Sequence, residues 1–335
     1  MLNKEFKLFT NCIPVKGINR GIIIDIQRDT YHIIPNSIID LINEYSGKKV
    51  YSLFQDFKND KYILKKYMRY FLANELVILT NCSNQFPLIS LDYERPNVID
   101  TLTINIDMPL QNLMDILDAN IDYLGVCCLR LVSHNFQTKK LIQILKFLQY
   151  SKIMSIVVYV KYTAELELEL KKIKSKLNRI EVVFFDCDKF GVNFTPVLNN
   201  FSYEEKSLEK ILSMKIENSN DFVFSIEGFS ESLKFNSVYN RSLYIDQTGD
   251  IKRYIDDDLV FGKILESNIK DVIFNVEILN FWTISKDKIK VCNDCEFRYI
   301  CPDGSIPFKE EQTDLLYSTI TKCNYDPYKN LWNND

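Results

Sequence analysis

Four cysteines gathered near the C-terminal end constrain this chain more than any other feature of its sequence. They lie in "KVCNDCEFRYICPDG" and "KCNYDPY", and they are Cys292, Cys295, Cys301 and Cys323. A CxxC pair sets two thiolates on one tight turn, and two further thiols can complete a four-ligand site. Four thiolates without a histidine suit zinc or an iron–sulfur cluster, and the spacing alone does not separate the two. The alternative is a chance grouping of buried thiols.

The composition is that of a globular protein in a reducing compartment. With 335 residues the chain is long enough for two or three domains. No apolar run approaches the roughly 20 residues that a membrane span needs, and the first residues lack the apolar core of a signal peptide. We therefore expect a cytoplasmic protein with no membrane partner, in which grouped cysteines are more often ligands than disulfides.

Charge and residue usage exclude several classes of function. The net charge of -4 offers no attraction to nucleic acid. The two histidines, His32 and His134, are too few for a histidine-rich metal site, and they argue against most Ser-His-Asp schemes. None of the nine glycines forms GxGxxG or GxxxxGK[ST], so no glycine-rich loop is available to hold a nucleotide phosphate.

Residues 1–80 are predicted to form a small unit of strands and helices. Two β-branched strands joined by a polar turn are a hairpin signal. A helix with an apolar stripe follows, with Asn36 as its N-cap, and then two more helices and a closing strand. The predicted elements are strands 19–27 and 30–35, helices 36–45, 51–57 and 61–75, and strand 76–80. This order suggests a winged-helix arrangement.

The rest of the chain predicts an α/β fold. Residues 81–97 are irregular and contain proline, so we interpret them as a linker. Apolar strands alternate with helices over residues 98–235, which favours a parallel sheet covered on both faces, in the form of a partial (β/α) barrel. The predicted strands are 98–106, 124–132, 154–162, 179–187 and 220–229, and one intervening helix has its apolar stripe at Leu166, Leu170, Ile173 and Leu177. The last part, residues 236–335, holds a predicted hairpin around Gly249, a helix and the cysteines.

The cysteine segment resembles the C-terminal half of a SPASM domain, the iron–sulfur module of many radical S-adenosylmethionine enzymes that modify peptides. That family shows CxxC, five residues, Cys, three residues, Cys and a distant Cys, preceded by a Gly-x4-Cys hairpin. The resemblance implies that one 4Fe-4S cluster is held by Cys292, Cys295, Cys301 and Cys323. Two positions that serve another cluster in the family are Ser305 and Tyr254 here. The resemblance therefore implies one complete cluster site and one lost site.

A second departure concerns the radical chemistry itself. Radical S-adenosylmethionine enzymes carry CxxxCxxC after the first barrel strand, whereas this chain reads "DMPLQNLMDIL" there and has no CxxxCxxC anywhere. We therefore expect a degenerate barrel that does not use S-adenosylmethionine.

Nearly the whole chain resembles a narrower family, the SPASM-domain peptide maturases of the grasp-with-spasm ribosomal-peptide systems. The resemblance is carried by "NCIPVKGINRGIIIDIQR", "YHIIPNSIIDLI", "FPLISLDYERPNVI" and "KDKIKVCNDCEFRYICPDG". It implies a partner of an ATP-grasp peptide ligase that acts on a ribosomally made precursor. It also implies that residues 1–80 are a PqqD-like unit, on which a leader peptide adds a strand to the sheet edge and packs on the third helix.

Candidate peptide contacts on that unit are Tyr31, Ile33 and Tyr67, with Phe71 beside them; the alternative is that they only fill a small core. Of the remaining candidates, Arg298 could offset thiolate charge or contact a peptide, and His134 is expected to be structural. We expect residues 256–258 to form a solvated acidic turn. The other cysteines are interpreted as buried small hydrophobes, namely Cys12, Cys82, Cys127, Cys128 and Cys187.

Three classes of function stay open. The first is a non-catalytic scaffold that captures the precursor and presents it to the ligase. The second is an enzyme whose cluster performs redox or Lewis-acid chemistry on the peptide. The third is a zinc-stabilised interaction module. The missing CxxxCxxC, the absence of a nucleotide loop and the shortage of histidine favour the first.

Overall fold

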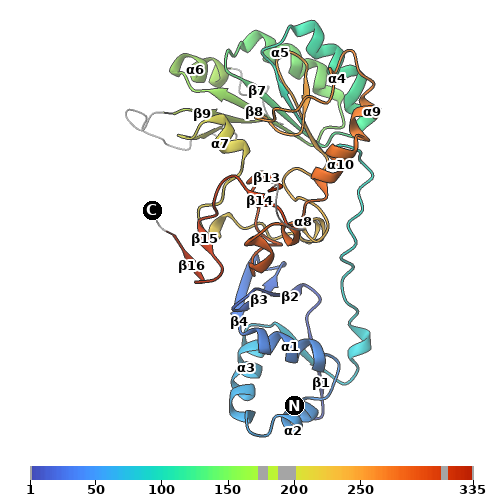
Figure 1. The fold of residues 1–335 in the computed structure, drawn as a ribbon, viewed down its shortest axis with the longest axis vertical. Coiled ribbons are helices and arrows are strands. Elements are labelled where there is room, and N and C mark those ends of the chain that lie inside the picture. The colour runs from blue at the N-terminus through green and yellow to red at the C-terminus, as the bar shows by residue number, and fades with distance from the viewer. Residues whose placement is uncertain (1, 173–179, 188–200, 311–315, 334–335) are drawn as a thin grey trace.

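The computed structural model describes residues 2–172, 180–187, 201–310 and 316–333. The molecule is elongated, with a small N-terminal unit at one end and a large α/β sheet at the other (Figure 1). The cysteine segment, residues 286–310 and 316–333, lies between them. None of the helices in the described ranges has the length and apolar character needed to cross a membrane.

The N-terminal unit contains the elements that its sequence predicts, together with two short strands that it does not. The helices are α1 (Asn36–Tyr45), α2 (Val50–Asp56) and α3 (Lys61–Ala73). The strands β2 (Cys12–Lys16), β3 (Gly21–Asp25) and β4 (Thr30–Ile34) form an antiparallel sheet in that order, and β1 (Glu5–Leu8) pairs with β5 (Val77–Thr80). The sequence of β1 and β2 mixes charged and apolar residues without a clear period, which explains why they were not predicted.

The first helix begins differently from the prediction. Its apolar stripe is buried as expected, but the residue before the helix is Pro35, at φ −61° and ψ 146°, and Asn36 is already helical. The side-chain amide of Asn36 donates to the carbonyl of Gly17 at 2.8 Å instead of capping the helix. Asn36 therefore ties α1 to the β2–β3 hairpin.

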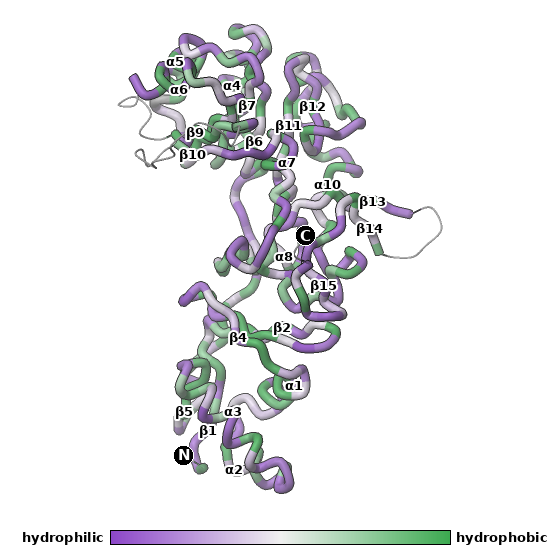
Figure 2. The backbone as a smooth tube through the Cα atoms, turned by 90° about the vertical axis from the view of Figure 1, so that its left-hand side faces the viewer, coloured by the Kyte–Doolittle hydropathy of each residue, from purple (hydrophilic) through white to green (hydrophobic). Residues whose placement is uncertain are grey.

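Strand β3 is buried on both faces. Ile23 packs into the core beneath α1 and α3, whereas Ile22 and Ile24 pack with Phe222 and Phe297 of the C-terminal half. The hydropathy view shows the apolar residues concentrated where this sheet meets α1 (Figure 2). The sheet formed by β2, β3 and β4 therefore contributes one face to the core of the N-terminal unit and the other face to the contact with the cysteine segment.

In the part of the chain that the structure describes, the large sheet has seven strands in the order β10-β9-β8-β7-β6-β11-β12. All neighbours pair in parallel except β11 and β12. The strands are β6 (Thr101–Asn105), β7 (Cys128–Ser133), β8 (Ser155–Lys161), β9 (Ile180–Phe185), β10 (Phe201–Tyr203), β11 (Ser242–Ile245) and β12 (Ile251–Lys252). Successive parallel strands from β6 to β10 are the order that a partial barrel requires. The protein is therefore a mixed α/β protein, as expected.

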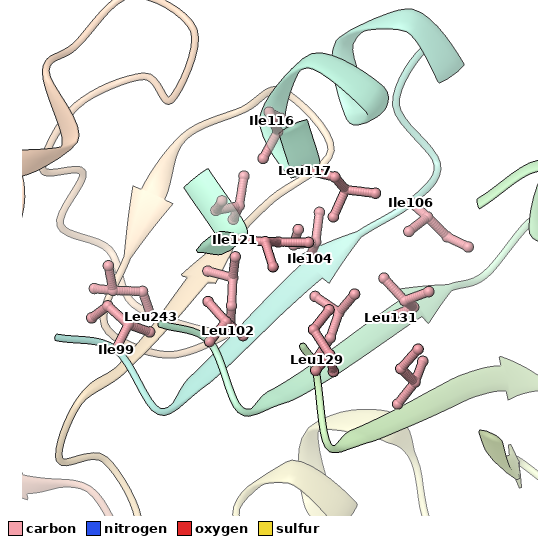
Figure 3. Packing of buried hydrophobic residues seen from close by; sticks show 14 of the residues in the cluster. Ile99, Leu102, Ile104, Ile106, Ile116, Leu117, Ile121, Leu129, Leu131 and Leu243 are labelled. Carbon is pink, nitrogen blue, oxygen red and sulfur yellow. The ribbon is translucent and has the colours of Figure 1, made fainter. Parts of the chain in front are cut away.

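The two faces of this sheet are unequal. One face packs on α4 (Leu110–Leu124), α5 (Thr138–Phe147) and α6 (Ala164–Lys172), and Figure 3 shows Leu102 and Leu129 beneath residues of α4. The other face carries Thr103, Asn105 and Arg130, with a smaller apolar cluster under α7 (Leu208–Leu212). Strand β6 therefore alternates between apolar and polar residues, contrary to the expectation of continuous apolar strands.

Two segments depart from the expected elements. Residues 220–229 were predicted as a strand, but the hydroxyl of Ser225 caps the short helix α8 (Ile226–Ser232) by accepting from the Gly228 amide. The hairpin around Gly249, whose φ is +85°, is confirmed. Its first strand, β11, pairs with β6, so the division expected at residue 236 passes through the sheet. Of the helix predicted from Leu166 to Leu177, the part after Lys172 lies outside the described residues.

The remaining elements are short. Helices α9 (Ile269–Ile273) and α10 (Val276–Trp282) pack on the core of the large sheet. The cysteine segment holds the 3₁₀ turns η5 (Lys286–Lys288) and η6 (Cys292–Asp294) and the paired strands β13 (Pro307–Phe308) with β14 (Ser318–Thr319) and β15 (Tyr325–Asp326) with β16 (Leu331–Trp332). Other 3₁₀ turns are η1 (Ser83–Gln85), η2 (Leu148–Tyr150) and η4 (Ser219–Asp221).

The segment predicted as a linker is anchored along its course. It runs along the side of the molecule (Figure 1). The hydroxyl of Tyr93 donates to a carboxylate oxygen of Glu231 at 3.0 Å, and Arg95 forms an ion pair with Glu227. Both acidic partners are on α8, so the segment is fixed to the middle of the molecule.

Candidate metal centre

Two of the four cysteines are set by one tight turn. The amide of Cys295 donates to the carbonyl of Cys292 at 3.0 Å and closes η6. The turn is entered through Val291, which has φ +68° and ψ −46°. A β-branched residue rarely adopts positive φ, because its side chain crowds the backbone. Backbone strain is therefore located directly beside Cys292.

The four cysteines predicted as ligands line one cavity of about 40 Å³. Lys286, Asp303 and Arg298 line it as well, and most of the remaining lining is apolar. All nine cysteines carry free thiols. Within the described ranges, no three cysteine, histidine, aspartate or glutamate side chains are close enough together to hold a metal ion. The fold thus brings the four thiols to one space without setting them in the spacing of a single-ion site.

Backbone amides point at the sulfurs in a repeated pattern. The amide of Phe297 donates to Sγ of Cys295, and the amide of Tyr325 donates to Sγ of Cys323, each at 3.4 Å. The backbone of Asp303 makes the corresponding bond to the thiol of Cys301. In each case the donor lies two residues after the cysteine. An N–H donor stabilises a thiolate more than a thiol, so this arrangement favours the charged form that binds metal.

Burial acts in the opposite direction on the same thiols. Removal from water raises the pKa of Cys292 to about 11 and that of Cys301 to about 12. Burial also raises the pKa of Cys295 and of Cys323. Without a metal these thiols are protonated at neutral pH, and ligation must release their protons.

Lys286 places a positive charge at the cavity. The lysine is buried, and its Nζ donates to the carbonyl of Asp303 at 2.9 Å. Burial alone would lower the pKa of Lys286, but the negative charges that Cys301 and Cys292 carry once they are ionised, together with that of Asp303, leave it raised. A buried ammonium is stable only beside negative charge, so Lys286 is matched to thiolates rather than to thiols.

The hairpin that joins β2 to β3, residues 16–21, docks on the cysteine loop. Nε of Arg20 donates to Oε1 of Glu296 at 2.7 Å, and the amide of Ile18 donates to the carbonyl of Asp294 at 2.7 Å. Arg298 contributes too, because its Nη1 donates to the carbonyl of Lys16 at 2.7 Å while its Nε donates to Asp287. These contacts fix Arg298 between the two units. Neither Arg20 nor Glu296 is predicted as a site residue from the sequence.

The candidate peptide-contact residues do not share one surface. The ring of Tyr31 packs on Phe297 at 5.0 Å and on Phe222 at 6.0 Å, so this side chain is committed to the contact between the units. Ile33 is half exposed, and β4 is an outer strand of its sheet in the described ranges. Tyr67 lies on α3 against Phe71.

The sequence does not identify two aromatic residues of α3 that are open to solvent, of which Tyr70 contacts β4. Tyr62 is 82% exposed and Tyr70 is 40% exposed, and the hydroxyl of Tyr70 contacts Nδ1 of His32 at 2.8 Å. Tyr62 and Tyr70 are eight residues apart, with Lys66 midway between them, which places the three on one side of the helix but does not show whether that side is exposed.

The positions expected to have lost a second cluster have other partners. The hydroxyl of Ser305 bonds that of Thr321 at 2.7 Å, and the ring of Tyr254 packs between Tyr239 and Phe281. Among the other cysteines, Cys12 and Cys187 are buried and Cys127 and Cys128 are half-buried, but Cys82 is exposed. Its place next to η1, outside any core strand, explains why the expectation of burial was wrong for Cys82.

Two further expectations concern polar residues. The acidic turn at 256–258 is only partly solvated, because Asp257 is buried and accepts from both Nε and Nη2 of Arg253, at 2.6 and 2.8 Å. The ring of His134 packs edge-on against Phe185, and its amide donates to Asp107. These contacts fit the structural role expected for His134.

Comparison with known proteins gives a distant likeness. No family model matches the chain, and no curated protein matches it. Two crystal structures of SuiB from Streptococcus suis match, one of them bound to S-adenosylmethionine. The structure with S-adenosylmethionine has a TM-score of 0.34 and 12% sequence identity, and the match covers 89% of this chain and 95% of the SuiB chain. The second SuiB structure has a TM-score of 0.35 and 11% identity, and the match covers 91% of this chain and 94% of the SuiB chain. The likeness is too distant to assign a role to any residue.

Proposed function

We propose that this chain is an accessory maturation protein for a ribosomally made peptide, working with an ATP-grasp ligase. In this proposal Cys292, Cys295, Cys301 and Cys323 hold one 4Fe-4S cluster, and the N-terminal unit binds the leader of the precursor. The observation that carries the proposal is the cavity that these four thiols line together, because four cysteines separated by up to 31 residues meet there.

The donor set fits an iron–sulfur cluster. The cavity is lined by four thiols and by no histidine, and it is largely apolar. Amides directed at three of the sulfurs, together with the buried Lys286, compensate the charge that thiolate ligation brings. A cluster supplies redox capacity or rigid cross-linking when bound; the chain itself supplies the ligands, the amide donors and the compensating charge.

The N-terminal unit offers a surface suited to an added strand. The outer strand β4 has backbone groups free for pairing on its open side in the described ranges, and Ile33 is half exposed there. The aromatic rings of Tyr62 and Tyr70 lie on the neighbouring helix α3, where they could cover an added strand. Main-chain pairing would give affinity and these apolar groups would give selectivity.

The cluster is tested by metal analysis of protein purified without oxygen. We expect about four irons and four sulfides per chain, with a matching visible spectrum, in the wild type and their loss in Cys295→Ser. Cys187→Ser, a buried thiol away from the cavity, is the matched control and should keep the full content. About one zinc without sulfide would contradict the cluster and favour a zinc-stabilised interaction module.

Leader binding is tested separately with the full-length chain. A fluorescently labelled leader segment of the precursor should bind the wild type, and Ile33→Asp should weaken binding at least tenfold by placing a charge on the strand edge. Tyr150→Ala changes an exposed tyrosine of the large domain and should have no effect. Equal binding by Ile33→Asp and the wild type would exclude this edge as the leader site.

A further inference from the structure

A polar row crosses the inner face of the large sheet, opposite the face that packs on α4. The register aligns Tyr244 of β11 with Thr103 of β6, and Thr103 with Arg130 of β7. Three side chains that can donate hydrogen bonds therefore lie next to one another in the middle of the sheet. On the next strand, β8, the residue aligned with Arg130 is Val157. Arg130 is therefore the only cation among the four aligned residues of β11, β6, β7 and β8.

In the described ranges, the guanidinium of Arg130 has no partner for its charge. The residue is half-buried, and its side chain forms no ion pair and no hydrogen bond to any described residue, whereas its backbone pairs in the sheet. Its neighbours are the phenol groups of Tyr159 and Tyr239, on whose pKa values its positive charge acts. A guanidinium carries five donors, and leaving them unmatched in a half-buried place is costly unless a ligand accepts from them.

Arg130 faces a cavity of about 50 Å³. Thr103, Tyr244, Tyr239 and Tyr254 share its lining, and α7 and the cysteine segment close it through Leu212 and Ile306. Since one water molecule needs roughly 10–15 Å³ of such space, the cavity accommodates a group of a few heavy atoms. The other arginine in the lining, Arg253, is already paired with Asp257 through two hydrogen bonds.

The charged residues that line the cavity restrict the charge of an anion that can bind in it. Glu209 and Asp256 also line it, and Asp256 is exposed to solvent. One unpaired guanidinium inside and two carboxylates around it disfavour a dianion such as sulfate or phosphate. A single carboxylate matches the guanidinium fork and needs no further cation.

We propose that this cavity is a binding site for a small monocarboxylate, with Arg130 as the cation that receives the carboxylate and Thr103 as a second donor. The site is separate from the cysteine cavity and does not depend on the proposed cluster. The same chemistry could come from a free small acid or from an acidic side chain of a bound peptide, and the size of the cavity favours the free acid.

The test uses the full-length protein and acetate as the probe. A titration followed by NMR of ¹³C-labelled acetate should show saturable millimolar binding to the wild type. Arg130→Met should weaken binding at least tenfold, and Arg130→Lys should retain part of it. Thr103→Val should weaken binding about threefold through loss of one donor. Arg69→Met, which removes an exposed arginine of α3, is the matched control and should bind as the wild type does.

Two other probes complete the test. Sulfate should bind more weakly than acetate, and equal or tighter binding of sulfate would overturn the assignment to a monocarboxylate. N-acetyl-aspartate amide presents a peptide-borne carboxylate, and its failure to bind would identify the free acid as the ligand. Unchanged acetate binding in both Arg130 variants, or no saturable binding to the folded wild type, would overturn the site altogether.

Discussion

Arg20 and Glu296 are 276 residues apart in the sequence, and Nε of Arg20 donates to a carboxylate oxygen of Glu296 at 2.7 Å. The side chain of Glu296 is 1% exposed, and the hydroxyl of Tyr325 donates to the same oxygen. This pair therefore joins the hairpin of the N-terminal unit to the loop between Cys295 and Cys301.

Breaking the pair should destabilise the whole chain. We expect Arg20→Met to lower the free energy of unfolding by about 1.5–3 kcal/mol, because a buried carboxylate loses a charged donor. In the double mutant Arg20→Met/Glu296→Gln the loss should be smaller than the sum of the two single losses. Urea unfolding measures all three. Lys16→Met, in an exposed ion pair with Asp40, should change stability by less than about 0.5 kcal/mol, and a similar cost there would contradict the argument.

Loss of cysteine ligation should loosen the hairpin. In Cys295→Ser, or after a chelator removes the proposed cluster, amide hydrogen exchange at residues 18–25 should become faster, because this hairpin is held by the cysteine loop. Exchange in α5, on the far side of the large sheet, should not change. Mass spectrometry of peptide fragments resolves the two regions, and unaltered exchange in the hairpin would show that it is held independently of the site.

Relief of the strain at Val291 should stabilise the fold. Glycine adopts positive φ without crowding, so Val291→Gly should raise the free energy of unfolding by about 1 kcal/mol after the entropy cost of glycine. Val276→Gly, at the exposed first residue of α10, should instead lower it. Thermal unfolding of the two variants compares them, and equal losses would mean that Val291 is not strained.

The charge of Lys286 should act on any cluster in the cysteine cavity. With the cluster bound, Lys286→Met should make its reduction potential more negative, because a nearby positive charge stabilises the added electron. Lys288→Met alters a neighbouring lysine whose Nζ donates to the carbonyl of Thr283, and should leave the potential unchanged. Spectroelectrochemical titration measures the reduction potential of each variant. The same shift in Lys286→Met and Lys288→Met would indicate a general effect on the loop and contradict a specific role of Lys286.

Acid should destabilise the N-terminal unit through Asp25. Burial alone would raise the pKa of this carboxyl group, but hydrogen bonds from Arg28 and Asn11 hold it below its ordinary value. Its contribution to stability is complete above the unfolded pKa of about 3.9, and it is lost as the pH falls through the lower folded pKa. Asp25→Asn should cost about 1–3 kcal/mol at pH 7 and flatten the decline in acid. Urea unfolding between pH 7 and pH 3 measures this, with Asp40→Asn as the exposed control.

The sequence predicted elements whose signals are local. Apolar runs such as residues 154–162 became strands, and the stripe from Ile38 to Tyr45 became the buried face of a helix. The four cysteines line one cavity, and their types and spacing are informative without long-range knowledge; that they are ligands of one site stays a prediction. The strand predicted over 220–229 was wrong because Ser225 caps a helix, which a local polar signal could have indicated.

Contacts between distant segments could not be predicted in the same way. Glu296 reads as a solvent-exposed residue between two cysteines, and only the approach of Arg20 and Tyr325 makes its burial possible. The sequence left open whether Tyr31 contacts a peptide or fills a core, and its ring packs on Phe297 of the distant cysteine segment. The alternation of Thr103 and Asn105 with Leu102 and Ile104 was visible in the sequence, and it was the signal for the polar inner face of the sheet.

The sheet formed by β2, β3 and β4 limits which parts of this protein can be replaced without loss of the fold. Ile22 and Ile24 are fully buried in a cluster that they share with residues of the C-terminal half. Separating the two halves would expose apolar surface on both, so neither half is an independent module that can be exchanged between related proteins. Under the proposed function, a change of peptide specificity would have to arise by substitution on the outer strand and α3, with the inner face of the sheet preserved.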